Sequence, residues 1–309
     1  MIIKQQIFAS AIVYVNDVEN TIENFLNRLY GVLHDNFEKF EIICVNDASR
    51  DSSKEIIRNL AGSFENCMLS VVNMSFYQGI EIAMRSGVDL AIGDFVFEFD
   101  GMDMDYEPSL IMESYNRSLQ GFDIVSCGSD SRRFTSKLFY KIYNENSGTQ
   151  YELRSESFRC MSRRAINRVH SMSMNIPYRK AQYSNCGLKA DFIYYQSKEG
   201  KLNNRPNLKS SHDTALTSLI LFTDIAYKTT LAFAFIMMLA TFGSIIYVIG
   251  VYFTNNSIVG YTTTMILISG AFFALFAILA MVIKYLSVIL GLVFHKQKYV
   301  IESIEKITG

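Results

Sequence analysis

The sequence predicts an α/β protein, a mostly parallel sheet domain followed by a two-helix transmembrane hairpin. Two observations carry this prediction. Short apolar, β-branched segments alternate with amphipathic segments over the first hundred residues, which is typical of parallel sheets. Later, no Asp, Glu, Lys or Arg occurs between Lys228 and Lys284. That run is much longer than the roughly 20 residues that one spanning helix needs.

The expected elements follow in chain order from hydrophobic periodicity. Apolar runs predict strands, and apolar residues at helical spacing predict helices between them. The expected strands are 7–15, 40–45, 67–73 and 95–99, and the expected helices are 18–33, 53–60 and 79–91. Ligands of such sheets bind beyond the carboxyl ends of the strands. Two of these ends are acidic, at 46–51 and at 100–105.

The second acidic segment carries Asp100, Asp103 and Asp105 within six residues. Carboxylates so close together suit a hard divalent cation such as Mg²⁺ or Mn²⁺, which takes oxygen ligands and bridges to substrate phosphates. The alternative is an Asp-rich turn whose side chains cap backbone amides. The sequence therefore predicts either a metal site or a capped turn at this edge of the sheet.

The uncharged run predicts two membrane spans, because the polar residues 254–257 interrupt it. Lysines flank both spans on the outside and the short connecting loop has none, so both termini should face the cytoplasm. A buried helical hairpin in a soluble core is the alternative. The expected organisation is a cytosolic domain at 1–204, a juxtamembrane segment at 205–228, transmembrane helices at about 229–253 and 261–283 within 229–293, and a cytosolic tail at 294–309.

Composition narrows the functional class further. The net charge of -1 gives no basic field for nucleic acid. Five scattered cysteines without a CxxC pair indicate reduced thiols in the cytosol. Residues 135–146 have apolar positions at helical spacing, which predicts an amphipathic helix at the membrane interface or, alternatively, in the core.

Several motifs, in order, resemble those of glycosyltransferase family 2, in the polyprenyl-phosphate branch that includes bactoprenol glucosyltransferases. The segments and the family patterns they resemble are 41–53 (EIIxVDDGSxDxT), 79–87 (GKEAALRAG), 91–94 (ARGD) and 156–166 (GDFRLLDRRVV). The resemblance covers almost the whole chain, and two C-terminal spans are this branch's own arrangement. It implies a GT-A, Rossmann-like fold.

The chain departs from the family pattern at several positions. Asn46 stands at the first Asp of VDDGS, and Ser157 stands at the Asp of GDFR. One extra residue precedes Pro108, so we align Asp100 and Asp103 with the two Asp of DADLQDPPE and Asp105 with its Gln. These departures keep open a catalytically inert homologue that acts as a membrane scaffold.

The resemblance implies inverting transfer of one sugar from a nucleotide-sugar, with UDP favoured, to undecaprenyl phosphate at the cytoplasmic membrane face, for surface-glycan modification. A lipid-linked oligosaccharide is the alternative acceptor, and a homo-oligomer is expected. A phosphate acceptor is already a nucleophile, so Asp100 is only a weak candidate for a general base. The implied residues are Asp100 and Asp103 for catalysis; Val13, Tyr14, Asn16, Asp47, Ser75, Gln78 and Asp100 for the nucleotide; Asp103 and Asp105 for Mg²⁺ or Mn²⁺; and Arg132, Arg133, Arg159 and Arg205 for the acceptor phosphate.

Overall fold

The computed structural model divides the 309-residue chain into two compact units. One unit comprises Met1–Ala215 and Lys296–Gly309, and the other comprises Leu216–His295. The structure describes part of each unit. The described residues are 4–129, 140–141, 143–145, 151–172, 178–197, scattered positions between 232 and 289, and 301–308.

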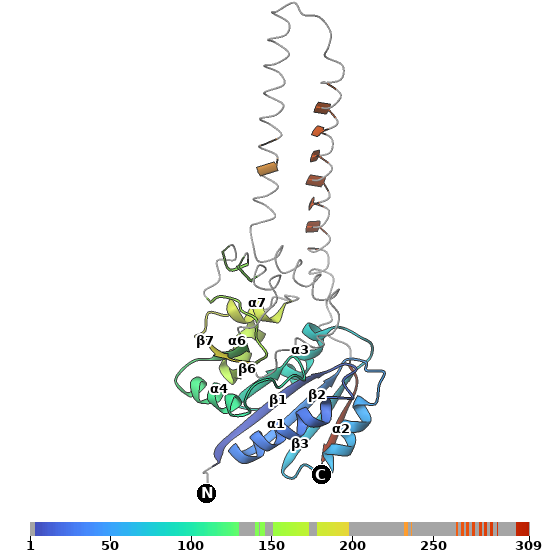
Figure 1. The fold of residues 1–309 in the computed structure, drawn as a ribbon, viewed down its shortest axis with the longest axis vertical. Coiled ribbons are helices and arrows are strands. Elements are labelled where there is room, and N and C mark those ends of the chain that lie inside the picture. Colours follow the sequence, from blue (N-terminus) through green and yellow to red (C-terminus); the bar gives the residue numbers. More distant parts are fainter. Residues whose placement is uncertain are drawn as a thin grey trace, which may run out of the picture. The chain divides into compact units, whose positions relative to one another are not determined.

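The first unit contains an eight-stranded sheet with the order β7-β5-β6-β4-β1-β2-β3-β8 (Figure 1). Strands β4, β1, β2 and β3 run parallel, as do β5 and β7, whereas β6 and β8 are antiparallel to their neighbours. The strands are β1 (Gln5–Val15), β2 (Phe37–Asn46), β3 (Cys67–Met74), β4 (Phe95–Phe99), β5 (Ile124–Ser129), β6 (Phe158–Ser162), β7 (Ala190–Tyr195) and β8 (Ile301–Thr308).

Helices cover both faces of the sheet. Successive side chains of a strand point to opposite faces, so each central strand contributes to two cores. The helices are α1 (Ile22–Asn36), α2 (Ser53–Ala61), α3 (Ile80–Leu90), α4 (Ser109–Leu119), α6 (Arg163–Ser171) and α7 (Arg179–Ser184). One core contains Val13 and Val15 of β1 with residues of α1, α2 and α4. The other contains Ile12 and Tyr14 with residues of α3, α6 and α7.

The seven expected strands and helices of the first hundred residues are confirmed. The strand at 95–99 has the expected bounds, and the others differ by a few residues at their ends. Helix α3 approaches the sheet closely at Gly87, where a Cβ atom would lie 2.5 Å from a side-chain methyl of Ile12. The turn before β4 is structural, since Asp94 accepts a hydrogen bond from the Phe8 backbone N–H at 3.1 Å. The five cysteines are free and buried.

The C-terminal segment is more than a tail. Residues Ile301–Thr308 form β8, which pairs antiparallel with β3 at one edge of the sheet (Figure 1). The Arg58 guanidinium and the Lys54 ammonium of α2 both contact the Glu305 carboxylate, at 2.6 and 3.2 Å. The sequence analysis places a cytosolic tail at 294–309 and does not predict this edge strand.

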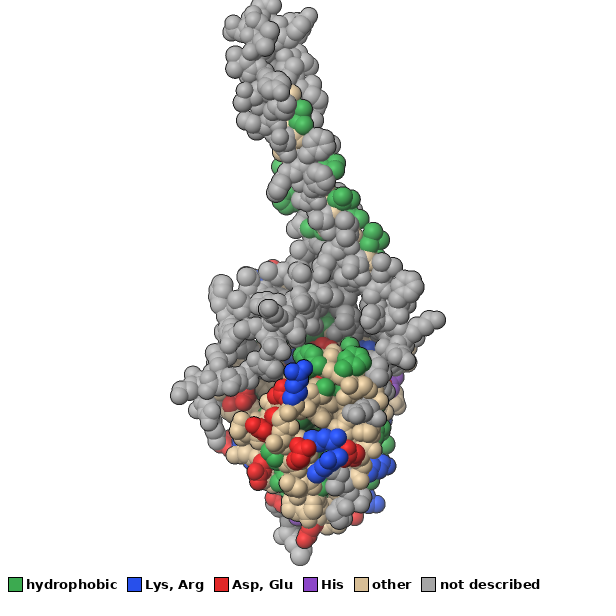
Figure 2. Space-filling view, turned by 90° about the vertical axis from the view of Figure 1, so that its right-hand side faces the viewer, with side chains coloured by type: hydrophobic (Ala, Val, Ile, Leu, Met, Phe, Trp, Pro, Cys, Tyr) green, Lys and Arg blue, Asp and Glu red, His purple; other side chains and the backbone are tan. Residues whose placement is uncertain are grey.

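The second unit is described only at scattered positions. The described residues between 264 and 289 are helical, and several large apolar side chains among them are exposed, including Leu275, Leu279 and Leu286. Figure 2 shows such side chains in green along this part of the chain. Within the described residues, no helix has the length and hydropathy needed to cross a membrane. Most of 205–228, 229–253 and 261–283 lies outside the described residues.

The expected amphipathic helix at 135–146 is described at five positions, all helical. Tyr143 is fully buried, which favours the core alternative at this position. The rest of this segment lies outside the described residues.

Candidate active site

Two loops lie side by side at the carboxyl edge of the sheet, one after β1 and one after β2. Hydrogen bonds between acidic side chains and backbone N–H groups connect them. The Arg50 N–H donates to Asp17 at 2.7 Å, the Glu19 N–H to Asp51 at 2.9 Å, and the Ser52 N–H to Glu19 at 3.0 Å. These three carboxylates therefore hold the two loops together.

The second loop contains a strained residue. Ala48 has a φ of 54°, in the left-handed region of the backbone. This conformation costs an alanine roughly 1 kcal/mol or more, because its Cβ atom lies too close to the following carbonyl oxygen. Asp17, in the first loop, has a φ of 51° but belongs to a residue type that tolerates this conformation. The hydrogen bonds between the loops offset the strain at Ala48.

Asp47 organises the same edge from inside the protein. Its carboxylate is fully buried and accepts hydrogen bonds from the backbone N–H groups of Gln78 and Gly79, each at 2.8 Å, and from the Tyr14 hydroxyl at 2.9 Å. Burial raises the pKa of Asp47, and these hydrogen bonds partly offset the rise. Asp47 thus joins β2 to the loop before α3 and offers no exposed oxygen.

Most of the residues expected at the nucleotide lie around this point. Asn16 donates its side-chain amide to the Asp47 carbonyl oxygen at 2.9 Å, so Tyr14, Asn16, Asp47 and Gln78 lie together. Ser75 is exposed on the loop that follows β3. Val13 differs, because its side chain is fully buried in the core and only its backbone could reach a ligand.

Two further residues on this loop were not expected. Phe76 is 57% exposed and Tyr77 is 43% exposed, directly between Ser75 and Gln78. Large exposed aromatic rings beside a polar loop offer flat surfaces on which a base can stack. Their position immediately after β3 is the signal that sequence reasoning could have used.

In the acidic turn after β4, carboxylate side chains that reach solvent alternate with methionine side chains that pack on the core. Asp103 is exposed, and the half-buried Asp105 accepts a hydrogen bond from the Tyr195 hydroxyl at 2.7 Å. Met104 is buried, and Met102 packs against the same core. Among the residues that the structure describes, no three His, Cys, Asp or Glu side chains converge on a metal site. Two carboxylates with substrate phosphates are nevertheless a common Mg²⁺ site, and Asp103 and Asp105 supply such oxygens.

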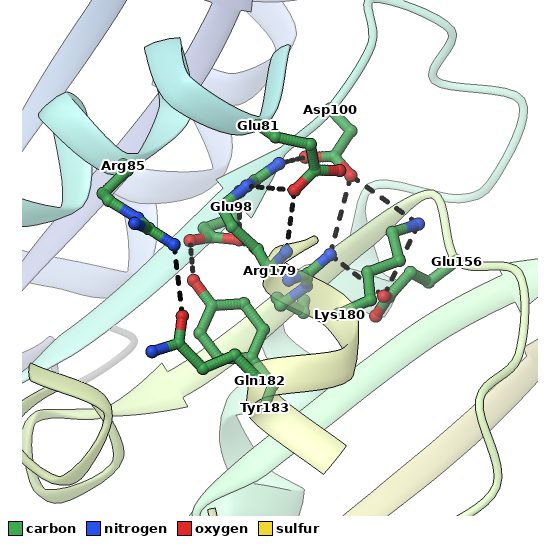
Figure 3. Close-up of polar contacts among 10 residues, drawn as sticks. Glu81, Arg85, Glu98, Asp100, Glu156, Arg179, Lys180, Gln182 and Tyr183 are labelled. Carbon is green, nitrogen blue, oxygen red and sulfur yellow. Dashed lines mark hydrogen bonds and ion pairs between the residues drawn. The ribbon is translucent and has the colours of Figure 1, made fainter. Parts of the chain in front are cut away.

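A cluster of charged side chains surrounds Asp100 (Figure 3). Two arginines are almost fully buried in it, Arg159 from β6 and Arg179 from α7. Arg179 donates to Glu98 and to Asp100, each at 2.8 Å, and to Glu81 at 3.2 Å. Buried charges are tolerated when paired and hydrogen-bonded in this way.

Arg159 and Lys180 complete the charged cluster. Arg159 donates to Glu156 at 2.9 Å and pairs with Glu98 at 3.1 Å. The Lys180 ammonium lies 3.7 Å from Asp100 and 3.5 Å from Glu156. Three cations thus face four carboxylates, and the cluster fixes the end of β4 against β6 and α7.

These cations determine the chemistry of Asp100. Burial opposes its ionisation, but Arg179, Arg159 and Lys180 outweigh burial and hold the pKa of Asp100 well below its ordinary value. A carboxylate with so low a pKa is a weak base. The structure therefore gives no support to Asp100 as a general base.

The expected contact of Arg159 with the acceptor phosphate does not agree with this geometry. The Arg159 side chain is 1% exposed and is surrounded by Glu98, Asp100 and Glu156. It is placed to position Asp100 instead. Arg132, Arg133 and Arg205 lie outside the described residues.

Sequence reasoning missed Arg179 and Glu98. A signal for them existed: Glu98 is an acidic residue inside the apolar strand FVFEF and needs a buried cation. The identity of that cation could not be read from the chain, because Arg179 lies 81 residues away.

The fold and the site define a GT-A-like α/β domain, whose polar loops gather at the carboxyl edge of a mostly parallel sheet. The family model for glycosyl transferase family 2 matches residues 10–186, more than half of the chain. The protein belongs to this family.

Three relatives are similar to this chain in sequence. The chain is 29% identical over 194 residues to an uncharacterized glycosyltransferase of Synechocystis, covering 60% of each chain. It is 30% identical over 164 residues to a prophage bactoprenol glucosyl transferase homolog of Escherichia coli, covering 50% of this chain and 52% of the relative. It is 29% identical over 124 residues to the undecaprenyl-phosphate 4-deoxy-4-formamido-L-arabinose transferase of Pseudomonas paraeruginosa, covering 40% and 36%. The matched segments thus span about three fifths or less of these relatives.

Solved structures that match the chain include a mannosyltransferase. The mannosyltransferase PcManGT of Pyrobaculum calidifontis, determined with GDP-Man and Mn²⁺, superposes with a TM-score of 0.49 at 15% identity, covering 70% of this chain and 63% of that one.

Proposed function

We propose that the protein transfers a single sugar from a nucleotide-sugar, with UDP favoured, to undecaprenyl phosphate or another polyprenyl phosphate. The bond between an acceptor phosphate oxygen and the anomeric carbon forms as the bond to the nucleoside diphosphate breaks, which inverts the anomeric centre. The names of the Escherichia coli and Pseudomonas relatives, with bactoprenol and undecaprenyl phosphate as acceptors, support this assignment.

One observation carries the proposal. The register pairs Val15 with Asn46 and Val13 with Phe99, so the loops after β1, β2 and β4 leave the sheet at the same edge. The paired loops and the exposed aromatic residues are suited to the nucleoside, and the acidic turn is suited to its diphosphate.

Asp103 and Asp105 would hold Mg²⁺ or Mn²⁺ through their carboxylate oxygens. When bound, the ion neutralises charge on the diphosphate leaving group as a Lewis acid. Met104 is buried and the half-buried Met102 packs against the same core, which supports this assignment because the two methionines then lie away from the ligand positions.

The charge state of Asp100 favours the phosphate acceptor over a sugar hydroxyl. A hydroxyl requires deprotonation, and the low pKa of Asp100 makes it a poor base. A phosphate is already ionised and needs only to be positioned. Arg132, Arg133 and Arg205 are the proposed cations for it, because guanidinium groups bind phosphate oxygens bidentately.

We also propose that residues 229–253 and 261–283 anchor the enzyme in the cytoplasmic membrane, with both termini on the cytoplasmic side. The uncharged run and the exposed apolar side chains at described positions of this unit support this. A polyprenyl acceptor is itself confined to a membrane, so the anchor would place the enzyme beside its substrate.

The test uses the purified full chain in detergent micelles with undecaprenyl phosphate and a panel of radiolabelled UDP- and GDP-sugars. We expect label in the lipid phase that is lost with EDTA. Replacing Asp103 or Asp105 by alanine should reduce transfer at least about 100-fold, since such ions contribute several kcal/mol. Glu107→Ala, on the same turn, is the matched control and should retain transfer.

Each other outcome has a defined meaning. Full activity in both Asp103→Ala and Asp105→Ala would overturn the metal assignment. Nucleotide binding without labelled lipid would contradict the polyprenyl phosphate acceptor. Absence of nucleotide binding by calorimetry would favour the inert scaffold.

A further inference from the structure

A row of polar residues crosses the sheet just below the nucleotide loops. The strand register places Ser303 of β8 opposite Asn73 of β3, Asn73 opposite Asn46 of β2, and Asn46 opposite Val15 of β1. The first loop residue after β2, Asp47, donates its N–H to the Val15 carbonyl at 2.9 Å. The row therefore leads from the C-terminal strand to the start of the second loop.

Hydrogen bonds run without interruption along the row. The Asn73 side-chain amide donates to the Ser303 hydroxyl at 3.0 Å and to the Glu305 carboxylate at 3.2 Å. The side-chain Oδ1 of Asn73 accepts from the Asn46 side-chain amide at 3.0 Å, and the side-chain Oδ1 of Asn46 accepts from the Ser49 backbone N–H at 3.1 Å. Asn73 is 2% exposed and Asn46 is 5% exposed, so water does not compete for these bonds.

The two ends of the row fix its direction. An amide side chain can be turned over, exchanging its donor and acceptor, so its orientation follows from its partners. At one end the Glu305 carboxylate only accepts, and at the other the Ser49 backbone N–H only donates. Arg58 and Lys54 hydrogen-bond Glu305 and lower its pKa, which keeps this end an acceptor. Both amides therefore have one orientation that satisfies every group.

We propose that Glu305 of the C-terminal strand, acting through Asn73 and Asn46, positions the loop at 47–50 for the nucleotide. This inference rests on the proposed function, because it assumes that the loop binds the donor. It also explains why asparagine stands at position 46, where the resembling motif has aspartate. A carboxylate at 46 would face the Asn73 carbonyl oxygen, so two acceptors would meet.

The test is a double-mutant cycle between Asn46 and Glu305, which are joined only through Asn73 along this row. Asn46→Asp forces the Asn73 amide to turn over, which sets its carbonyl oxygen against the Glu305 carboxylate. Glu305→Gln supplies an N–H donor for the turned amide, so the double variant should recover. We expect Asn46→Asp to weaken UDP binding in the presence of Mn²⁺ about tenfold, since hydrogen bonds to charged groups contribute about 1.5 kcal/mol or more.

Two readouts, UDP affinity and the split between donor KM and kcat, separate a positioning role from a merely structural one, and a third, thermal unfolding, tests whether the row is coupled at all. UDP affinity by calorimetry should return to within about threefold of the wild type in the double variant. Donor KM should rise in Asn46→Asp while kcat at saturating donor changes little. Thermal unfolding of the same four proteins should show the same rescue without any nucleotide.

Two controls isolate the amide row from the ion pairs of β8. Arg58→Gln removes a partner of Glu305 but leaves its carboxylate beside Asn73, so it should not rescue Asn46→Asp. Lys306→Gln changes an exposed side chain of the same strand and should leave UDP affinity unchanged.

The outcomes are distinguishable. Additive effects of Asn46→Asp and Glu305→Gln, without rescue, would overturn the inference. If the wild type binds no nucleotide, the proposed function fails, and the unfolding cycle still decides whether the row is coupled. If Asn46→Asp does not fold, Glu305→Leu, which removes the acceptor of the Asn73 amide, decides alone: a donor KM raised about two- to threefold supports the row, and an unchanged KM contradicts it.

Discussion

Replacing Arg179 by methionine should destabilise the sheet-bearing unit more than any surface substitution. Its guanidinium contacts Glu98 and Asp100 at 2.8 Å and Glu81 at 3.2 Å, and the side chain is 2% exposed. Methionine would leave two cations facing four carboxylates in the cluster. Removing one partner of a buried ion pair costs about 3–5 kcal/mol, because the remaining charge stays buried and uncompensated.

The measurement is thermal unfolding of the purified chain by far-ultraviolet circular dichroism. A loss of that size corresponds to a fall in Tm of about 10 °C for a unit of roughly 200 residues. The control is Arg164→Met, whose side chain is 70% exposed and pairs with Asp123 at 2.8 Å. The arginine end of that pair lies in solvent, and the buried Asp123 keeps its hydrogen bond from the Ser162 hydroxyl at 2.9 Å, so the loss should cost about 1 kcal/mol or less.

A second variant tests the cause of the effect. Adding Glu98→Gln to Arg179→Met removes one of the uncompensated charges, so the double variant should be more stable than Arg179→Met alone. The reasoning is refuted if Arg179→Met unfolds within about 1 kcal/mol of the wild type, or if Glu98→Gln adds to its loss instead of offsetting it.

Three further predictions concern stability and are checked by the same unfolding assay. Ala48→Gly should raise the free energy of unfolding by about 0.5–1 kcal/mol. Glycine relieves the strain of the left-handed backbone at φ 54°, and this gain exceeds the extra entropy that glycine gives to the unfolded chain. A lower free energy of unfolding would contradict the strain. Gly87→Ala should destabilise by about 1–3 kcal/mol, because its Cβ would lie 2.5 Å from a methyl of β1, whereas Gly31→Ala, with nothing within 4 Å, should stabilise helix α1. Asp100 and Glu156 have pKa values held below their ordinary ones, despite burial, by Arg179 and Arg159 respectively and by Lys180. Their contribution is therefore present above pH of about 5 and lost as the pH falls below about 4, and a Tm that rises on acidification would contradict this.

The sequence predicted the first half of the sheet because local signals determine it. Strands β1 to β4 are predominantly apolar, and the helices between them have buried residues at helical spacing. The positions of the two acidic loops followed from the general rule for strand ends in parallel sheets. These features require no knowledge of distant contacts.

The rest depends on contacts between segments far apart in the chain. The insertion of β6 between β4 and β5 and the addition of β8 beside β3 are choices of partner, which no local pattern encodes. The same holds for Arg159. Its motif suggested a cation available to a ligand, but its burial beside Glu98 reverses that role, and only the tertiary structure brings these two groups together.

The pairing of β8 with β3 also has a consequence for the biosynthesis of the protein. Asn73 and Ser303 are 230 positions apart, and chains emerge from the ribosome amino terminus first. Until residues 301–308 have been made, β3 is an open sheet edge, and its unpaired backbone N–H and C=O groups can pair with strands of other chains. Contacts of such long range also form slowly. A ribosome-stalled chain that ends before 301 should therefore aggregate more readily and be cleaved sooner by protease near β3 than the released protein.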